Sequence, residues 1–280
     1  MAAPFLTRRS VILQKAESTY GTDPTPVVGT DAVLTAVPTI NTDVQVLDRI
    51  VSVNTLSPTQ PVIGRKLVRA GFQVEMKSEA AALDGVDSNP IQIDELLRMS
   101  GFNPTYTVET SPPSSNDGFV TYAPVSDGFE SVTTYIYVGG EVLHSITGGF
   151  ANISMDFVAG QYPMINAEIV GIYNEPTDST ASTPTYATDV PVQTESLSLA
   201  FGAVTGIVCR NFSINMNNEI VERPDVNSAE GLIGLRIAGR RPTATFRIEK
   251  ETVADWNIYN ALDVGTTYST TFTQGSSDGS

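Results

Sequence analysis

The stretch that decides the fold is GFANISMDFV at residues 149–158, followed after the link AGQYP by MINAEIVG at residues 164–171. In both segments apolar and polar side chains alternate, which is the period-two pattern of a β-strand with one buried and one solvated face. The five-residue link contains glycine, so the two segments are predicted to form a β-hairpin. Strands with one wet face are typical of an antiparallel sheet.

The same alternation recurs elsewhere in the chain. It is found at residues 68–77 and 208–217. Residues 131–138 and 141–147 are predicted to form a second hairpin around a Gly-Gly turn. These segments extend the expected sheet on both sides of the first hairpin.

Helical spacing of apolar residues is confined to two segments, 90–100 and 252–263. The second is predicted to begin with Thr252 as its N-cap and to bury Trp256 in its apolar stripe. Many short alternating segments with so few helices predict an all-β protein, a β-sandwich or barrel with one or two short helices.

A repeat relates residues 48–77 to residues 222–250. Each copy begins with an acidic residue and an arginine, passes through Gly-Arg-Lys or Gly-Arg-Arg, and reaches a phenylalanine with a glutamate three positions later. The arginine-to-glycine spacing is 15 residues in the first copy and 16 in the second, and the glycine-to-phenylalanine spacing is 8 and 7. A predicted helix and strand follow both. We therefore expect an internally duplicated strand–long loop–strand–helix unit and a pseudo-two-fold in the sheet.

The organisation expected from these patterns is one large domain. Residues 1–30 are expected to form an N-terminal arm and residues 274–280 a disordered tail. Between them, residues 31–273 are expected to form a single β domain. Its parts are the duplicated halves at about 40–110 and 215–273, the central hairpins at 119–172 and a surface loop at 174–191.

The charge balance narrows the classes of function. The 280 residues include 16 Lys and Arg against 31 Asp and Glu, a formal net charge of −15. Domains that grip nucleic acid or a membrane surface need clustered cations, so this balance argues against both. The sequence shows no apolar stretch long enough for a signal peptide or a membrane helix. We expect the chain to be made in the cytosol, with no membrane partner.

Catalytic and metal chemistry have few candidates. Cys209 is the only cysteine and His144 the only histidine, which excludes an intrachain disulfide, a cysteine-based zinc site and a His-rich metal centre. The sequence contains no nucleophile elbow, P-loop or dinucleotide-binding motif. His144 is expected as a partly buried strand residue and Cys209 as a small buried hydrophobe. We therefore expect neither an enzyme nor a cofactor.

Two basic clusters stand out against the acidic composition: Arg65-Lys66-Arg69 and Arg240-Arg241-Arg247. Neither is interleaved with aromatic residues, which argues against single-stranded nucleic acid. The clusters either balance carboxylates within the chain or meet carboxylates of a neighbouring subunit. We favour the intersubunit alternative because both clusters occupy the same place in the repeat.

An ordered series of motifs resembles one family. The series consists of AESTYGTDPTP at 16–26, FQVEM at 72–76, LLRMSGF at 96–102, YAPVS at 122–126, GFESVT at 128–133, GIYNEPT at 171–177 and NEIVER at 218–223. Together these resemble the tail tube (major tail) proteins of long-tailed siphophages, over about residues 16 to 272. Family members continue past the second helix with two strands where this sequence has one. Three alternatives are open: the last strand is lost, it is supplied by a neighbour, or this copy is short.

The resemblance implies a structural virion protein. It implies a β-sandwich or barrel subunit of the phage tail tube type, which assembles into homohexameric rings in the host cytoplasm. The rings stack into a tube, and their inner sheets form a continuous barrel around a negatively charged lumen. DNA passes through this lumen without specific binding during genome ejection. The implied partners are further copies of the chain, a tape-measure protein, and tail terminator and distal tail proteins.

The resemblance also implies site residues. The hairpin 149–171 is the candidate lumen-lining element, and the candidate lumen residues are Asn152, Ser154, Asp156, Asn166, Glu168, Glu75 and Glu249. Asp156 and Glu168 are expected to face each other across the hairpin. The loop 49–64 is the candidate ring-to-ring contact, with 223–239 as second choice. The candidate contact residues are Arg49, Leu56, Pro58, Pro61, Ile63, Arg65, Arg69, Arg223, Arg240 and Arg241.

Two alternatives remain at this point. One is another oligomeric virion protein, such as a tail terminator or a decoration protein, which would form a single ring or a cap. The other is a carbohydrate-binding β-sandwich or a glycosidase. That alternative needs an exposed aromatic platform, whereas Trp256 is the only tryptophan.

Overall fold

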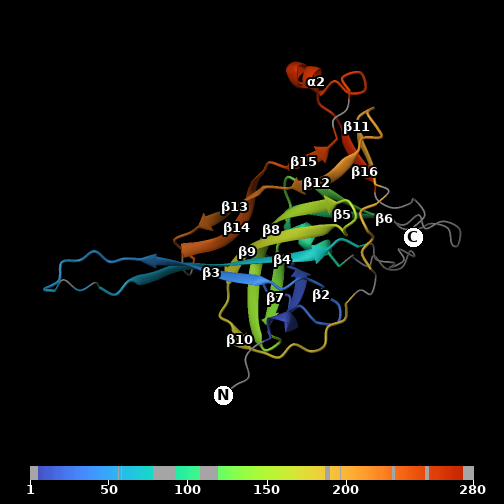
Figure 1. Ribbon diagram of the computed structural model, residues 1–280. Helices are drawn as coiled ribbons and strands as arrows, with labels where there is room; N and C mark the ends of the chain where they lie inside the picture. Colours follow the sequence, from blue (N-terminus) through green and yellow to red (C-terminus); the bar gives the residue numbers. More distant parts are fainter. Residues whose placement is uncertain are drawn as a thin grey trace.

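One long, bent antiparallel sheet organises the chain (Figure 1). The computed structural model describes residues 6–55, 57, 59–77, 92–107, 119–186, 190–195, 197–228, 231–249 and 252–273. The sheet runs in the order β2-β1-β7-β8-β9-β4-β3, and β12 and β15 continue it from β8. Its strands are β1 (Val11–Ala16), β2 (Ala32–Val33), β3 (Thr39–Leu47), β4 (Val62–Glu75), β7 (Val132–Val138), β8 (Val142–Val158), β9 (Met164–Tyr173), β10 (Thr177–Asp178), β12 (Cys209–Asn215) and β15 (Thr243–Ile248).

The bend lies in β8, which has 17 residues and changes its neighbour halfway. Its first half pairs with β7 and its second half with β12, while β9 lies along the opposite edge. A bulge between Thr147 and Phe150 separates the two halves. Gly148 adopts φ +60° there, and a Cβ on Gly149 would lie 2.7 Å from the carbonyl oxygen of Val132. Only glycine accommodates both requirements, so the pair fixes where the strand bends.

The predicted central hairpin is confirmed: residues 159–163 link β8 to β9. On the dry face, Ala151, Ile153, Ile165 and Ala167 are at most 2% exposed, and Met155 on the same face is partly buried. They pack against α1 (Asp94–Met99), which contributes Leu96, Leu97 and Met99 to the same core. The helix is shorter than the predicted 90–100, and residues 78–91 lie outside the described part of the chain.

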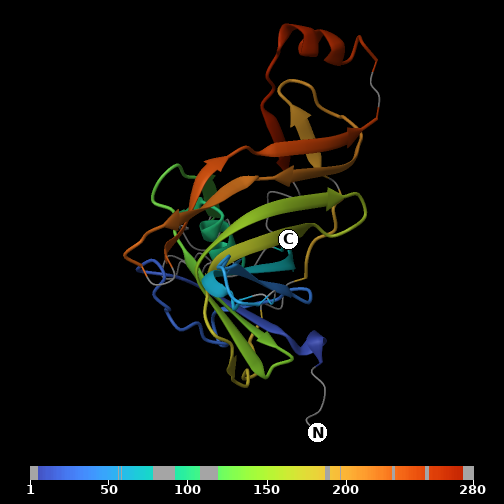
Figure 2. The same cartoon turned by 90° about the vertical axis from the view of Figure 1, so that its left-hand side faces the viewer.

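The dry face of β12 and β15 is covered by aromatic side chains. Phe157 stacks on Phe212 at 4.4 Å between ring centroids, and Phe212 on Phe246 at 5.7 Å. Phe201 of β11 (Ser198–Phe201) and Phe272 of β16 (Thr270–Thr273) pack onto this group. Figure 2 shows these two strands and α2 (Ile258–Val264) at one end of the molecule.

The prediction for the second helix was wrong in two respects. Its N-cap is Asn257, whose side-chain oxygen accepts the backbone N–H of Asn260, and Thr252 lies outside it. Trp256 precedes the helix and stacks on Phe201 at 5.2 Å. Ala261 is the one α2 residue that is buried, so the helix contributes little to the core.

Two further hairpins and one strand pair complete the architecture. β3 and β4 form a long hairpin that projects from the body, and the described residues between 48 and 61 form its tip (Figure 1). β13 (Asn218–Pro224) pairs with β14 (Leu232–Arg240), and β5 (Phe102–Thr107) pairs with β6 (Phe119–Pro124). In the described part of the chain, no helix combines the length and apolar character needed to cross a membrane.

Part of the expected N-terminal arm is a strand of the main sheet. Within the expected arm 1–30, Val11, Ile12 and Leu13 are buried in β1, between β2 and β7. Glu17 follows the strand, and its carboxylate accepts four hydrogen bonds of 2.6–2.7 Å. The donors are the N–H groups of Gly21 and Gly148 and the hydroxyls of Ser131 and Thr133. This carboxylate therefore joins the N-terminal segment to β7 and to the bulge of β8.

Glu17→Gln should destabilise the fold. The amide keeps one acceptor oxygen but turns an NH2 group toward two donors, so at least two charge-assisted hydrogen bonds are lost. The free energy of unfolding should fall by roughly 3 kcal/mol in urea denaturation. Glu141→Gln, which changes an exposed carboxylate on the β7–β8 turn, is the matched control and should stay within about 0.5 kcal/mol of the unsubstituted protein. Equal effects of the two substitutions would contradict this role of Glu17.

Candidate functional site

One face of the sheet carries most of the predicted lumen residues. In the cross-strand register, Asn152 lies opposite Glu168 and Ser154 opposite Asn166. Met164 lies between Asp156 on one side and Glu75 on the other. The six candidates on β4, β8 and β9 therefore share one face, which we call the polar face.

Hydrogen bonds connect the polar face across the strands. Gln73 donates to the side-chain oxygen of Asn166 at 2.7 Å, and Asn166 donates to the carboxylate of Asp156 at 2.6 Å. Asn152 donates to the side-chain oxygen of Asn215 at 3.2 Å. The first two bonds join β4, β9 and β8, and the third joins β8 to β12, so side-chain hydrogen bonds link each of these neighbouring strands on the sheet surface.

The expected pairing of Asp156 with Glu168 was wrong. Asp156 lies opposite Met164, and Glu168 lies opposite Asn152. The register follows from the link at 159–163, which places each β8 residue against a β9 residue at a fixed offset. The two carboxylates are therefore separated along the hairpin.

The polar face begins where a covering hairpin ends. On the same side of the sheet, Phe150 and Val170 pack beneath Leu235 and Ile237 of the β13–β14 hairpin. Two residues further along the strands, Asn152 replaces Phe150 on this face and Glu168 replaces Val170. Polar side chains therefore begin where the apolar cover stops, as expected for a surface left open in the single chain.

Glu249 lies just past β15 and is exposed. Its carboxylate is 3.6 Å from the guanidinium of Arg210, a residue that is also exposed. Glu249 follows Arg247 at the strand period of two, so it lies at the margin of the polar face rather than at its centre. Arg247 lies opposite Asn211 and contributes a positive charge to that margin.

The polar face includes residues that the sequence did not nominate. Gln73 lies opposite Asn166, Ser213 opposite Asp156, and Asn215 opposite Ser154. Thr243 and Thr245 continue the rows on β15. Alternation identifies the polar side of each strand, but only the register of β12 against β8 joins these rows.

The projecting β3–β4 hairpin, here called the arm, exposes apolar side chains. Ile50 is fully exposed, and Val46 and Ile63 are each 54% exposed. The other exposed apolar residues of the arm are Val44, Leu47, Val51, Val53 and Val62. Exposed apolar groups gathered on one projecting element are typical of a contact surface.

The remaining candidates in loop 49–64 are placed as follows. Arg49 and Pro61 are exposed. The hydroxyl of Thr59 donates to the carbonyl of Arg49 at 2.6 Å across the loop. Leu56 and Pro58 lie outside the described residues.

The first basic cluster has partners within the chain. Arg65 lies 2.7 Å from the carboxylate of Glu222 on β13 and 3.7 Å from that of Asp43 on β3. Arg69 lies 3.9 Å from the same Asp43 carboxylate. Intrachain carboxylates therefore account for these two arginines, and the Arg65–Glu222 pair ties the β13–β14 hairpin to the base of the arm.

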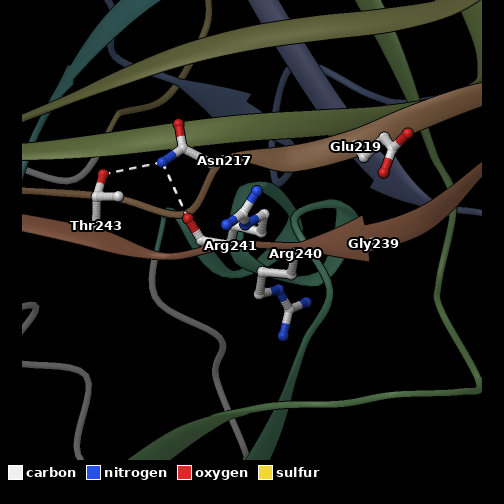
Figure 3. Close-up of a pocket in the computed structure, with 6 residues that line it drawn as sticks. All are labelled: Asn217, Glu219, Gly239, Arg240, Arg241 and Thr243. Atoms are coloured by element: carbon white, nitrogen blue, oxygen red, sulfur yellow. Dashed lines mark hydrogen bonds between the residues drawn. The ribbon is translucent and has the colours of Figure 1, made fainter.

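Arg240 and Arg241 differ although they are adjacent (Figure 3). The Arg240 guanidinium donates to the carbonyl of Gly101 at 2.8 Å and to Asn218 at 3.0 Å, and it lies 5.6 Å above the ring of Phe102. It therefore holds β14 against the C-terminal end of α1. Arg241 is exposed at an open hollow between β13 and β15. Arg223, at the far end of β13 and away from this hollow, is also exposed.

The expectation of a buried Cys209 was wrong, because its side chain is only partly buried, whereas His144 is partly buried as expected. Burial lowers the pKa of His144, which lies half-buried on β8, and raises the pKa of the Cys209 thiol. The described residues hold no cluster of three or more His, Cys, Asp or Glu side chains suited to a metal ion.

Comparison with known protein families gives one match. Residues 7–280 match the family described as phage tail tube protein, which covers nearly the whole chain. The chain belongs to this family. No curated protein sequence matches it. The predicted resemblance and the predicted all-β fold are thereby confirmed, and the protein is a structural component of a phage tail tube.

The two adjacent arginines of this tail tube protein provide a matched test of the intrachain role. Arg240→Ala should lower the free energy of unfolding by about 2 kcal/mol, because the carbonyl of Gly101 and the side chain of Asn218 lose a charged donor. Arg241→Ala should change it by less than about 0.5 kcal/mol, since the hydrogen bonds of Arg241 with Asn217 use only its backbone. Thermal and urea denaturation measure both. A larger loss from Arg241→Ala would contradict the assignment.

Proposed function

We propose that the protein assembles into rings, with six copies per ring as the family resemblance implies, and that the rings stack into the tail tube. The polar face lines the lumen and the arm contacts the adjacent ring. The genome passes along the polar face during ejection without specific binding. Assembly takes place in the host cytoplasm. The observation that carries this proposal is the open polar face, which begins where the β13–β14 cover ends.

The chemistry of the polar face supports a lumen. Its centre carries amide and hydroxyl groups with the carboxylates of Asp156, Glu168 and Glu75. Carboxylates repel phosphates, and neutral amides give phosphates no counter-charge, so DNA slides past such a surface without being held. The positive charges nearest to it lie at its margins.

The arm supports stacking. A hairpin that projects with Ile50, Val46 and Ile63 exposed leaves apolar area in water, and burial against a second ring would remove that area. Rings stack without limit only when the contact joins two different surfaces of the subunit. The arm and the body of the next subunit meet this requirement. A tape-measure protein inside the tube and terminator and distal tail proteins at its ends are the remaining partners that we propose.

Shortening the arm should abolish tubes while keeping the fold. Leu47 and Val62 lie opposite each other, so replacing residues 48–61 by Asn-Gly closes the hairpin with a two-residue turn. Negative-stain electron microscopy should show tubes for the unsubstituted protein and single rings for the shortened one.

A pair of point substitutions locates the contact more sharply. Ile50→Asp at the tip of the arm should prevent stacking, whereas Val226→Asp should leave it intact. Val226 is 96% exposed at the tip of the β13–β14 hairpin and is the matched control. The opposite result would move the ring-to-ring contact to the second hairpin.

The lumen assignment predicts selective labelling of tubes. In a Cys209→Ser background, Glu168→Cys on the polar face should react with a small maleimide but resist a polymer-linked maleimide too bulky to enter the tube. Ser198 is exposed on β11, a strand that packs on the dry face of the sheet, so Ser198→Cys should react with both reagents. Equal labelling of both cysteines by the bulky reagent would refute the lumen assignment and leave the tube itself in place.

A further inference from the structure

Two hairpins of the sheet share one register. Ser213, Ile214 and Asn215 of β12 pair with Thr245, Ala244 and Thr243 of β15. Thr39, Ile40 and Asn41 of β3 pair with Gly71, Ala70 and Arg69 of β4. Every position in the first set exceeds its counterpart in the second by 174, as 213 does 39 and 245 does 71.

The side chains follow the same correspondence. Ser-Ile-Asn at 213–215 matches Thr-Ile-Asn at 39–41. Ala-Thr-Phe-Arg-Ile-Glu at 244–249 matches Ala-Gly-Phe-Gln-Val-Glu at 70–75. Shared sequence and shared register support the internal repeat. The repeat therefore relates the β12–β15 hairpin, which pairs with β8 through β12, to the β3–β4 hairpin, which pairs with β9 through β4.

The two hairpins differ in which of their edges is paired with a further strand. The outer edge of β4 pairs with β9, from Leu67 opposite Ile172 to Glu75 opposite Met164. The corresponding edge of β15 pairs with no strand in the described part of the chain. Conversely, β12 pairs with β8, whereas the corresponding edge of β3 pairs with none of the described strands. Among the described residues, the series β3-β4-β9-β8-β12-β15 therefore ends in two open edges, β3 and β15, and unpaired strand edges are templates for another strand.

The two open edges are compatible in strand direction and in charge. All neighbours in the series β3-β4-β9-β8-β12-β15 are antiparallel, so β15 of one copy and β3 of the next would also meet antiparallel. Neither strand contains proline or lysine, the residues that commonly protect an edge. On the side of the polar face, β15 carries Arg247 and β3 carries Asp43, which are opposite in charge, although Asp43 also lies within 4 Å of Arg65 and Arg69 of its own chain.

We propose that β15 of one copy pairs directly with β3 of a second copy, so that each chain supplies six consecutive strands to the inner sheet of the ring. This inference rests on the proposed ring assembly and names the strands that join its subunits. The second copy is the occupant because the edges are two different surfaces of one chain. Such heterologous contacts close into a ring when the rotation between successive copies divides a full turn evenly.

Disulfide trapping tests the joint. In a Cys209→Ser background, Thr245→Cys is combined in turn with Thr39→Cys, Asn41→Cys and Asp43→Cys, three positions on the same side of β3. After oxidation of assembled protein, at least one combination should give a ladder of covalent multimers on a non-reducing gel. The highest band then counts the copies in a ring. Single-cysteine variants should give no ladder.

A matched control separates edge pairing from random collision. Thr245→Cys combined with Thr177→Cys on β10 places the second cysteine on an exposed strand beside the first half of β8, away from both open edges, and should give no ladder. Rings or tubes in the microscope without a ladder from any β3 combination would overturn the β15–β3 joint alone. A preparation with neither rings nor a ladder would overturn the proposed function as well.

Discussion

The backbone of Gly148 is the point on which the rest of the structure depends. Its N–H donates to the carboxylate of Glu17, and its carbonyl accepts the hydroxyl of Tyr20 at 3.2 Å. The same Tyr20 oxygen accepts the N–H of Leu235 at 2.6 Å. At this bulge β8 exchanges β7 for β12, so the N-terminal segment holds the bend and the β13–β14 hairpin together. Burial raises the pKa of Tyr20, and its hydroxyl stays protonated and able to donate.

This arrangement decides which part of the sheet stays open. Because Leu235 is fixed to the bulge, the apolar side chains of its hairpin cover Phe150 and Val170. Beyond them the hairpin reaches β8 through Asn218, the first residue of β13, whose N–H donates to the side-chain oxygen of Asn152 at 3.0 Å. The network from Gln73 through Asn166 to Asp156 begins beyond that cover. Extending the cover over these groups would bury amides and a carboxylate, which costs free energy unless every group finds a partner. The boundary between apolar and polar side chains on β8 is therefore also the boundary of the hairpin.

Local pattern was enough to predict the strands of the central hairpin, but not β1, which lies in the expected N-terminal arm, or β14, most of which lies in the expected loop 223–239. Distance along the chain explains other features that the pattern could not predict. Period-two alternation identified the central hairpin and its link at 159–163, because the pattern is complete within each segment. It divided residues 141–158 into two strands, whereas β8 continues through its bulge. The hydrogen bond from Gly148 to Glu17 spans 131 positions, and that from Arg240 to Gly101 spans 139. No window of sequence contains both partners, so the intrachain role of Arg240 emerged only from the fold.

The distribution of positive charge follows from the same contacts. Arg65 pairs with Glu222, and Arg98 pairs with Asp94 and Glu130. Arg240 binds a carbonyl at the C-terminal end of α1. These arginines therefore join elements of the chain and do not lie on the polar face. An acidic chain can thus keep its cations and still present a surface on which phosphates find no partner. Arg247 is an exception, and it lies on β15 at the open edge of the sheet; Arg69 of β4, which is 54% exposed, also lies on the same side of the sheet as Gln73. If that edge joins β3 of the next copy, the carboxylate of Asp43 comes to the same seam. Arg247 would then approach a carboxylate that already lies beside Arg65 and Arg69 of its own chain, so the contact between copies would extend an ion-pair group that begins at the base of the arm.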